Sequence, residues 1–312
     1  MRFRLPLLLS ALLLVHAGAA LAGDDLKIQV LDQPITDLRA YADALQASVA
    51  TTTGPAGSAA LAQRSAGGTS DVLLVPYYES DRRNPSGIDT LFAVHNETGE
   101  SLPIRILYLT RAGATQQKVQ EITLGPRATE TINLRDVPGL EVDSDGVARG
   151  LVILGVVGPA HKATSNLLSG DYFHLDPRTG VSTGGNLANL SLDDPGNELC
   201  SEWSTRFFNG GSFKGRTEYR AVVDVPQGSA DYDNPTAIGT VFDESGKPIQ
   251  SFEIRTDLHS FRLPAAELVP DGMAFGSLEI RFLSTKGLLL TEHSGLDRLS
   301  VSLAAACRDD VE

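Results

Sequence analysis

The segment "DGVARGLVIL" at 145–154 and the segment "DGMAFGSLEIRF" at 271–282 share one pattern, in which Asp-Gly, an Ala and a second Gly lead into a strand-like run. Glycine after Asp allows a turn conformation that other residues resist. The second glycine opens a strand where a side chain would crowd its neighbour. The repeated pattern predicts an internal duplication.

Short strand-like runs surround both copies, and Gly, Pro and Asn occupy the turns between them. No long amphipathic helix pattern follows residue 71, which argues against a parallel α/β sheet. The fold class predicted is all-β, with two tandem antiparallel β-sandwich domains of immunoglobulin-like type. The strands are expected at 72–78, 90–96, 103–110, 117–124, 129–135, 149–157 and 168–175, and then at 217–225, 237–242, 250–256, 259–263, 276–283, 287–293 and 300–305.

The run at 217–225 alternates, with Tyr219 and Ala221 on one face and Glu218 and Arg220 on the other. This alternation predicts a strand with one buried face and one face in water.

The N-terminus resembles a secretory signal peptide over 1–22, because two arginines precede an apolar stretch and a small-x-small cleavage site. An uncleaved anchor is the alternative. Residues 23–50 follow as an N-terminal segment with an amphipathic helix from residue 34. That helix either docks on its own protein, stays mobile or recruits a partner. Residues 51–70 are small and polar and predict a flexible linker.

The predicted domains are then 71–178 for the first sandwich, 179–198 for an interdomain linker and 199–312 for the second sandwich. Cys200 and Cys307 are the two cysteines and bracket the second sandwich. In an oxidising compartment this pair predicts a disulfide, with free thiols or an intermolecular link as alternatives.

The net charge of −13 argues against nucleic acid as a partner, because phosphates require a basic face. The apolar content of 42% is enough for ordinary cores. No segment after the signal peptide is long and apolar enough for a membrane span. We expect a secreted or periplasmic protein, with attachment to the cell surface as a further option.

No motif for catalysis, a cofactor or a metal is recognised, so we assign no catalytic residue, no metal ligand and no cofactor. Histidines such as His174 could join a Ser and an Asp in space, but lone histidines are usually structural. Calcium is a second possibility for the acidic loops with Asp143 and Asp145 and with Asp231 and Asp233. Solvated acidic loops are common in so acidic a chain.

One candidate binding surface combines Tyr77 and Tyr78 with the cationic pair Arg82 and Arg83. Trp203, beside a Gly-rich turn, is a further candidate because exposed aromatic rings stack on sugars or anchor partners. The alternative for these aromatic residues is that they fill a core.

The runs "VPYYESDRRNPSGIDTLFAVHNETGE" (75–100) and "LSGDYFHLDP" (168–177) resemble secreted bacterial proteins of unassigned function that carry immunoglobulin-like sandwiches. The resemblance covers most of 71–307. It implies a fold, and no functional residues are carried over with it.

The function we expect is that of a non-enzymatic extracytoplasmic protein with a structural, adhesive or partner-binding role. The partner would be a protein or a glycan. The alternative is a secreted carbohydrate-binding or carbohydrate-active protein.

Overall fold

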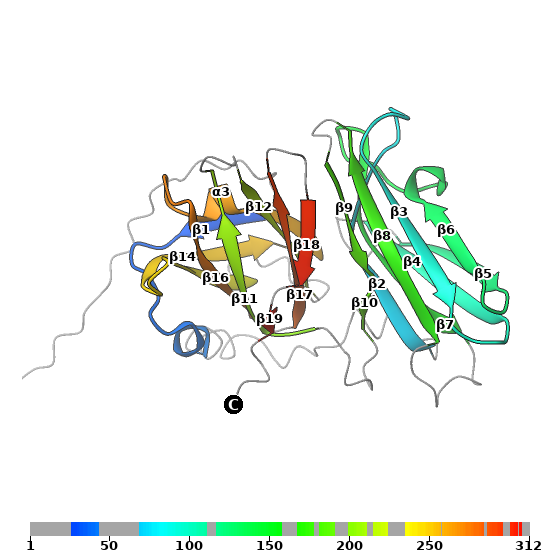
Figure 1. Cartoon of the computed structure of the whole chain (residues 1–312), viewed down its shortest axis with the longest axis horizontal. Coiled ribbons are helices and arrows are strands. Elements are labelled where there is room, and N and C mark those ends of the chain that lie inside the picture. Colours follow the sequence, from blue (N-terminus) through cyan, green and yellow to red (C-terminus); the bar gives the residue numbers. More distant parts are fainter. Residues whose placement is uncertain are drawn as a thin grey trace, which may run out of the picture.

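The computed structural model describes residues 26–43, 69–110, 117–157, 167–177, 181–190, 199–210, 215–223, 235–256, 258–283, 286–295, 300–304 and 306–307. Most of these residues lie in antiparallel strands, so the chain is all-β (Figure 1). Among them, no helix has both the length and the apolar character needed to span a membrane. The predicted signal peptide and most of the predicted linker at 51–70 lie outside the described residues.

The first half of the chain forms two sheets. A five-stranded sheet has the order β10-β2-β7-β4-β5, and a four-stranded sheet has the order β6-β3-β8-β9. The elements are β2 (Thr69–Asp81), β3 (Asp89–Asn96), β4 (Leu102–Thr110), β5 (Gln117–Leu124), β6 (Thr129–Asn133), the 3-10 turn η1 (Leu134–Asp136), β7 (Val147–Val157), β8 (Leu168–Asp176), β9 (Val181–Asn186) and β10 (Ala188–Asn189).

The second half forms two further sheets. A six-stranded sheet has the order β1-β14-β13-β16-β11-β19, and a second four-stranded sheet has the order β15-β12-β17-β18. The elements are β1 (Leu26–Val30), β11 (Glu202–Phe208), β12 (Arg216–Val223), β13 (Ala237–Phe242), β14 (Pro248–Thr256), β15 (Ser260–Pro264), α3 (Ala265–Leu268), β16 (Phe275–Phe282), β17 (Gly287–Ser294), β18 (Ser300–Ala304) and β19 (Ala306–Cys307).

The two halves have the same strand order. When β2 to β10 and β11 to β19 are each numbered one to nine, both halves contain a sheet 9-1-6-3-4 and a sheet 5-2-7-8. Gly146 precedes the sixth strand of the first half, and Gly272 precedes the sixth strand of the second. Both glycines have the positive φ that favours glycine, at 86° and 81°. The two halves thus have one strand order, and the two Asp-Gly turns occupy equivalent places in it.

Each half has an apolar core between its two sheets. The first core contains Phe92 and Tyr172 from the four-stranded sheet and Ile104 from the five-stranded sheet. The second core contains Trp203 and continues onto the opposite face of the five-stranded sheet, where it includes Leu74 and Leu107. Apolar packing is thus continuous from one half to the other.

The N-terminal strand β1 belongs to the second half, although it precedes the first half in sequence. It pairs with β14 and forms the edge of the six-stranded sheet, and in Figure 1 it lies in blue beside the yellow strands of that half. Residues 38–43 are helical, and Leu38 and Ala42 pack on Ile238 and Leu283. The predicted helix therefore begins later than expected, since residues 34–37 are not helical, and residues 44–50 lie outside the described residues.

Residues 181–186 and 188–189, which were predicted to belong to an interdomain linker, form β9 and β10 of the first half. The strand β9 pairs with β8, and β10 pairs with β2. Glycines 184 and 185 in β9 hid this strand, because glycine carries no strand propensity. Of the rest of the predicted linker at 179–198, Leu190 packs in the second core, and residues 179–180 and 191–198 lie outside the described residues.

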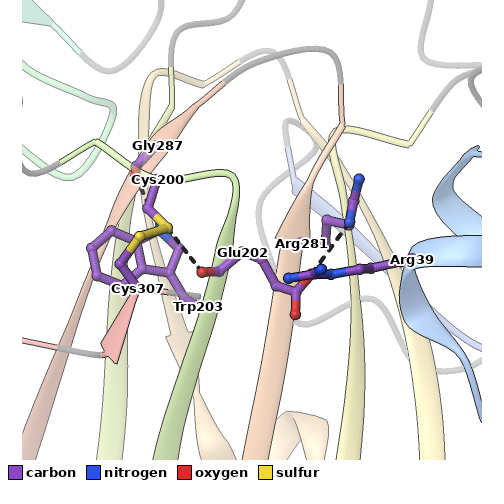
Figure 2. The surroundings of a disulfide bond; sticks show 7 residues. All are labelled: Arg39, Cys200, Glu202, Trp203, Arg281, Gly287 and Cys307. Carbon is purple, nitrogen blue, oxygen red and sulfur yellow. Dashed lines mark hydrogen bonds and ion pairs between the residues drawn. A yellow bond between two sulfur atoms is a disulfide. The ribbon is translucent and has the colours of Figure 1, made fainter. Parts of the chain in front are cut away.

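Cys200 and Cys307 form the predicted disulfide, with their sulfur atoms 2.11 Å apart (Figure 2). Beside it, the Trp203 indole N–H donates to the carbonyl oxygen of Gly287 at 3.0 Å. Glu202 accepts from Arg39 of the N-terminal segment at 2.9 Å and from Arg281 of β16 at 3.3 Å. The N-terminal segment is therefore anchored close to the disulfide.

Candidate functional site

The candidate site starts from a bulge in β2. The register against β7 shifts between Val75 and Tyr78, so that Pro76 and Tyr77 together face one residue of β7. Proline lacks an N–H and is confined to edges and bulges within sheets. The extra residue reverses the alternation of the strand. Tyr78 therefore enters the first core, whereas Tyr77 and Glu79 point toward the second half.

Those two side chains join a group of buried and partly buried charged and aromatic residues between the halves, which we call the junction cluster. In Figure 1 the sheet that contains β12, β17 and β18 faces the first half at β9, β10 and β2. The junction cluster consists of Tyr77, Glu79, Arg149 and His174 from the first half and Glu218, Arg220, Arg262 and Glu292 from the second half.

At the bulge, three contacts among the described residues join the two halves. The Arg220 guanidinium carbon lies 4.4 Å from the centre of the Tyr77 ring, which is within the range of a cation–π interaction. Arg262 lies 3.4 Å from the Glu79 carboxylate. The Ser260 hydroxyl donates to the carbonyl oxygen of Pro76 at 3.1 Å. The bulged residues are thus held by the second half on both their side chains and their backbone.

Within each half, further ion pairs balance the charges. Arg149 donates to Glu79 at 2.8 Å in the first half. Arg220 binds both oxygens of Glu292 at 2.8 and 3.0 Å in the second. Arg262 also pairs with Glu218. Each carboxylate therefore has a guanidinium partner, which is the condition under which buried charges are tolerated.

The electrostatics keep these groups charged and keep His174 neutral. Burial raises the pKa of Glu79, but Arg262, His174 and Arg149 outweigh it and bring the pKa to about 2. Burial lowers the pKa of His174 to about 3, and Arg220 acts in the same direction. Near neutral pH, Glu79 is thus an anion and His174 is uncharged.

The geometry of the junction cluster is that of a structural contact between the two halves. His174 places one ring nitrogen 3.0 Å from the Thr90 hydroxyl and the other 3.5 Å from Glu79. Both neighbours already serve other partners, since Thr90 bonds to the backbone of Glu79 and Glu79 pairs with two arginines. The arrangement fixes orientation through matched charges.

The alternation of β12 predicted that Glu218 and Arg220 face water, and this is wrong. Both side chains are buried, because their face of the strand meets the first half. The alternation correctly separates the two faces of β12. A face with charged side chains can nevertheless be buried, provided that the neighbouring half supplies opposite charges.

The predicted binding residues do not form one exposed surface. Tyr77, Tyr78 and Trp203 are buried, with exposed fractions of 4%, 0% and 3%. Arg82 donates to the carbonyl oxygens of Leu134 and Val137 and so supports the turn at η1. Arg83 is exposed. Tyr78 and Trp203 therefore offer no ring face to a sugar.

In the acidic loop, the carboxylates of Asp143 and Asp145 are also paired within the protein. Arg149 binds both carboxylates at 2.8 Å. In the part of the chain that the structure describes, no group of three or more His, Cys, Asp or Glu side chains is placed to hold a metal ion. The second acidic loop, with Asp231 and Asp233, lies outside the described residues.

Sequence reasoning missed Glu79, Arg149, Arg220, Arg262 and Glu292 as members of one site. They come from five different strands of both halves, and no local spacing relates them. Pro76 was the one local signal, because a proline within a strand-like run indicates a bulge and hence a change of face.

A scan against protein-family models finds no match for the chain, and a search of curated proteins finds none either.

Proposed function

We propose that this is a non-enzymatic extracytoplasmic protein with a structural or adhesive role, which binds a protein partner on two rigidly joined domains. The observation that carries the proposal is the junction cluster. Its charges are matched and its contacts cross between the halves at Tyr77, Glu79 and Pro76. A rigid scaffold that positions loops and edges is a common basis for binding.

We further propose that each half is a β-sandwich of immunoglobulin-like type. The pairing of second with fifth strands and of third with sixth strands supports this, since the immunoglobulin fold contains both pairs. The first strand of each half, however, pairs with the sixth, and the seventh pairs with the second. These outer strands have exchanged sheets relative to the immunoglobulin order, so the likeness is one of architecture.

The proposed compartment rests on two features. The sequence pattern at 1–22 is typical of a secretory signal peptide. The bond between Cys200 and Cys307 is typical of oxidising compartments. The proposal predicts a mature chain that begins at Gly23 in the periplasmic or secreted fraction, which N-terminal sequencing would establish.

The functional proposal is tested by pairing a search for turnover with a search for a partner. The full chain would be assayed on ester, peptide and glycoside substrates, alongside the variants Glu79→Gln and His174→Ala. We expect no activity that these variants remove, and we expect a defined protein crosslinked to the chain in its native compartment. Turnover that disappears in both variants would refute the non-enzymatic role.

A further inference from the structure

The duplication makes β5 and β14 equivalent strands. Each is the fourth strand of its half and pairs with the third strand. The registers align Ile122 with Ile254 and Glu121 with Glu253, so both strands carry the dipeptide Glu-Ile at the same place.

The two equivalent strands differ in what lies on their outer edge. Strand β14 is covered by β1, whose Ile28 lies opposite Ile254 and whose Gln29 lies opposite Glu253. Among the described residues, no strand pairs with the outer edge of β5. An open edge presents unpaired backbone N–H and C=O groups, which form a template for another strand.

Equivalent side chains on β14 and β5 differ in exposure in the same way. The Glu253 side chain is 7% exposed, whereas the equivalent Glu121 side chain is 63% exposed. Ile254 is fully buried, whereas Ile122 is only partly buried and packs at the rim of the first core. The apolar residue that β1 covers in the second half is therefore left at a partly open rim in the first.

In both halves, a neighbouring turn packs against the start of the fourth strand. Lys118 of β5 donates to the carbonyl oxygen of Pro138, and the equivalent Gln250 of β14 donates to that of Leu268 at 2.8 Å. Each contact holds the turn that follows the fifth strand against the start of the fourth. Strand β1 pairs beyond this point, from Phe252 to Thr256. The matching stretch of β5 is 120–124.

From this equivalence we propose that the outer edge of β5 is a strand-acceptor site that binds an extended segment of a partner protein. The inference rests on the partner-binding function proposed above and names the mode of binding. Backbone hydrogen bonds would supply affinity, and alternate side chains would supply specificity.

The chemistry of the partner segment follows from the β1 pairing. Apolar residues should lie opposite Ile122 and Leu124, as Ile28 and Leu26 lie opposite Ile254 and Thr256. An uncharged polar residue should lie opposite Glu121, since Arg105 already neutralises that carboxylate at 2.8 Å. The occupant is thus a five-residue strand of alternating apolar and polar residues with little net charge.

The test uses the peptide DLKIQVLD, which is the sequence of residues 25–32, as a probe added to the full mature chain. Backbone amide exchange would be measured by mass spectrometry with and without peptide. With the peptide at about ten times its Kd, exchange within Gln117–Leu124 should slow by about tenfold, and exchange within Pro248–Thr256 should not change.

Ile122→Lys places a charge on the edge and should abolish the slowing, whereas Glu130→Lys on the other edge strand β6 should preserve it. A second test changes the peptide and leaves the protein unaltered. The backbone nitrogens of the peptide are methylated at alternate residues, in either of two patterns, and one of the two patterns should abolish binding. Slowing confined to Pro248–Thr256, or none in β5, would overturn the strand-acceptor site. A natural partner that still binds Ile122→Lys would overturn it too, while leaving the partner-binding function standing.

Discussion

At the scale of single residues, Glu79 connects the two halves. Its carboxylate contacts Arg149 of its own half and Arg262 of the other half, and it is almost fully buried. Removing one partner of a buried ion pair leaves the remaining charges without compensation in a medium that solvates them poorly. Substitution of Glu79 is therefore the most direct test of the junction by a single residue.

Glu79→Gln should reduce the free energy of unfolding by about 3–5 kcal/mol, because Arg149 and Arg262 lose their shared anion. Urea denaturation measures the change. The matched control is Glu121→Gln, which removes an exposed carboxylate paired with Arg105 and should reduce stability by about 1 kcal/mol or less. Equal, small effects for both variants would contradict the assigned role of Glu79.

Stability should also fall as the pH is lowered from neutrality. The folded state holds His174 neutral, with its pKa lowered from 6.5 to about 3, so the unfolded chain binds more protons below pH 6.5. Glu79, with its pKa lowered from 4.5 to about 2, adds to the loss below pH 4.5. Urea denaturation between pH 7 and pH 4.5 should show this fall, and His174→Gln should make it shallower. An identical slope in the variant would refute the assignment.

At the scale of elements, local patterns predicted most strands because turn residues and alternation are local signals. The run 117–124 coincides with β5, and 237–242 coincides with β13. The glycines of β9 obscured that strand, although its partner β8 directly precedes it. Strand β1 escaped prediction because its partner β14 lies far away in the sequence. The junction cluster escaped for the same reason, since its members lie far apart in sequence and the bulge at Pro76 reverses a face.

The two Asp-Gly turns offer a test of the duplicated element. Gly272→Ala should lower stability by about 1 kcal/mol because its φ is positive, and Gly146→Ala should lower it by at least as much because a Cβ there also lies 2.7 Å from the Arg83 side chain. Gly99→Ala is the control, since a methyl group there meets no atom within 4 Å and its φ is not positive. Thermal unfolding would compare the three variants. A destabilised Gly99→Ala, or an unchanged Gly272→Ala, would be inconsistent with this explanation.

The disulfide should stabilise the second half by constraining the unfolded chain. Its cysteines are 107 residues apart, for which the chain-entropy model gives about 4–5 kcal/mol. Urea denaturation with and without a reductant measures the difference. Unchanged stability after reduction, or recovery of both cysteines as free thiols by non-reducing peptide mapping, would contradict it.

At the scale of the whole molecule, the duplicated halves use equivalent sheets for different purposes. The second four-stranded sheet of the molecule presents Glu218, Arg220 and Arg262 to the junction, while the six-stranded sheet receives β1 at its edge. The first half supplies Glu79 from the bulge and leaves β5 uncovered among the described strands. The two halves thus differ in what they contribute to the junction and in what covers the outer edge of their fourth strands.

The distance between spin labels on the two halves tests this rigid joint most directly. Labels would replace the exposed residues Glu130 of β6 and Lys247, which precedes β14. Pulsed electron–electron double resonance should then give a narrow distribution of label-to-label distances in the native chain. The distribution should broaden when Glu79 and Arg262 are both changed to Ala. A broad distribution in the native chain, unaltered by those substitutions, would contradict the claim that the junction cluster locks the two halves together.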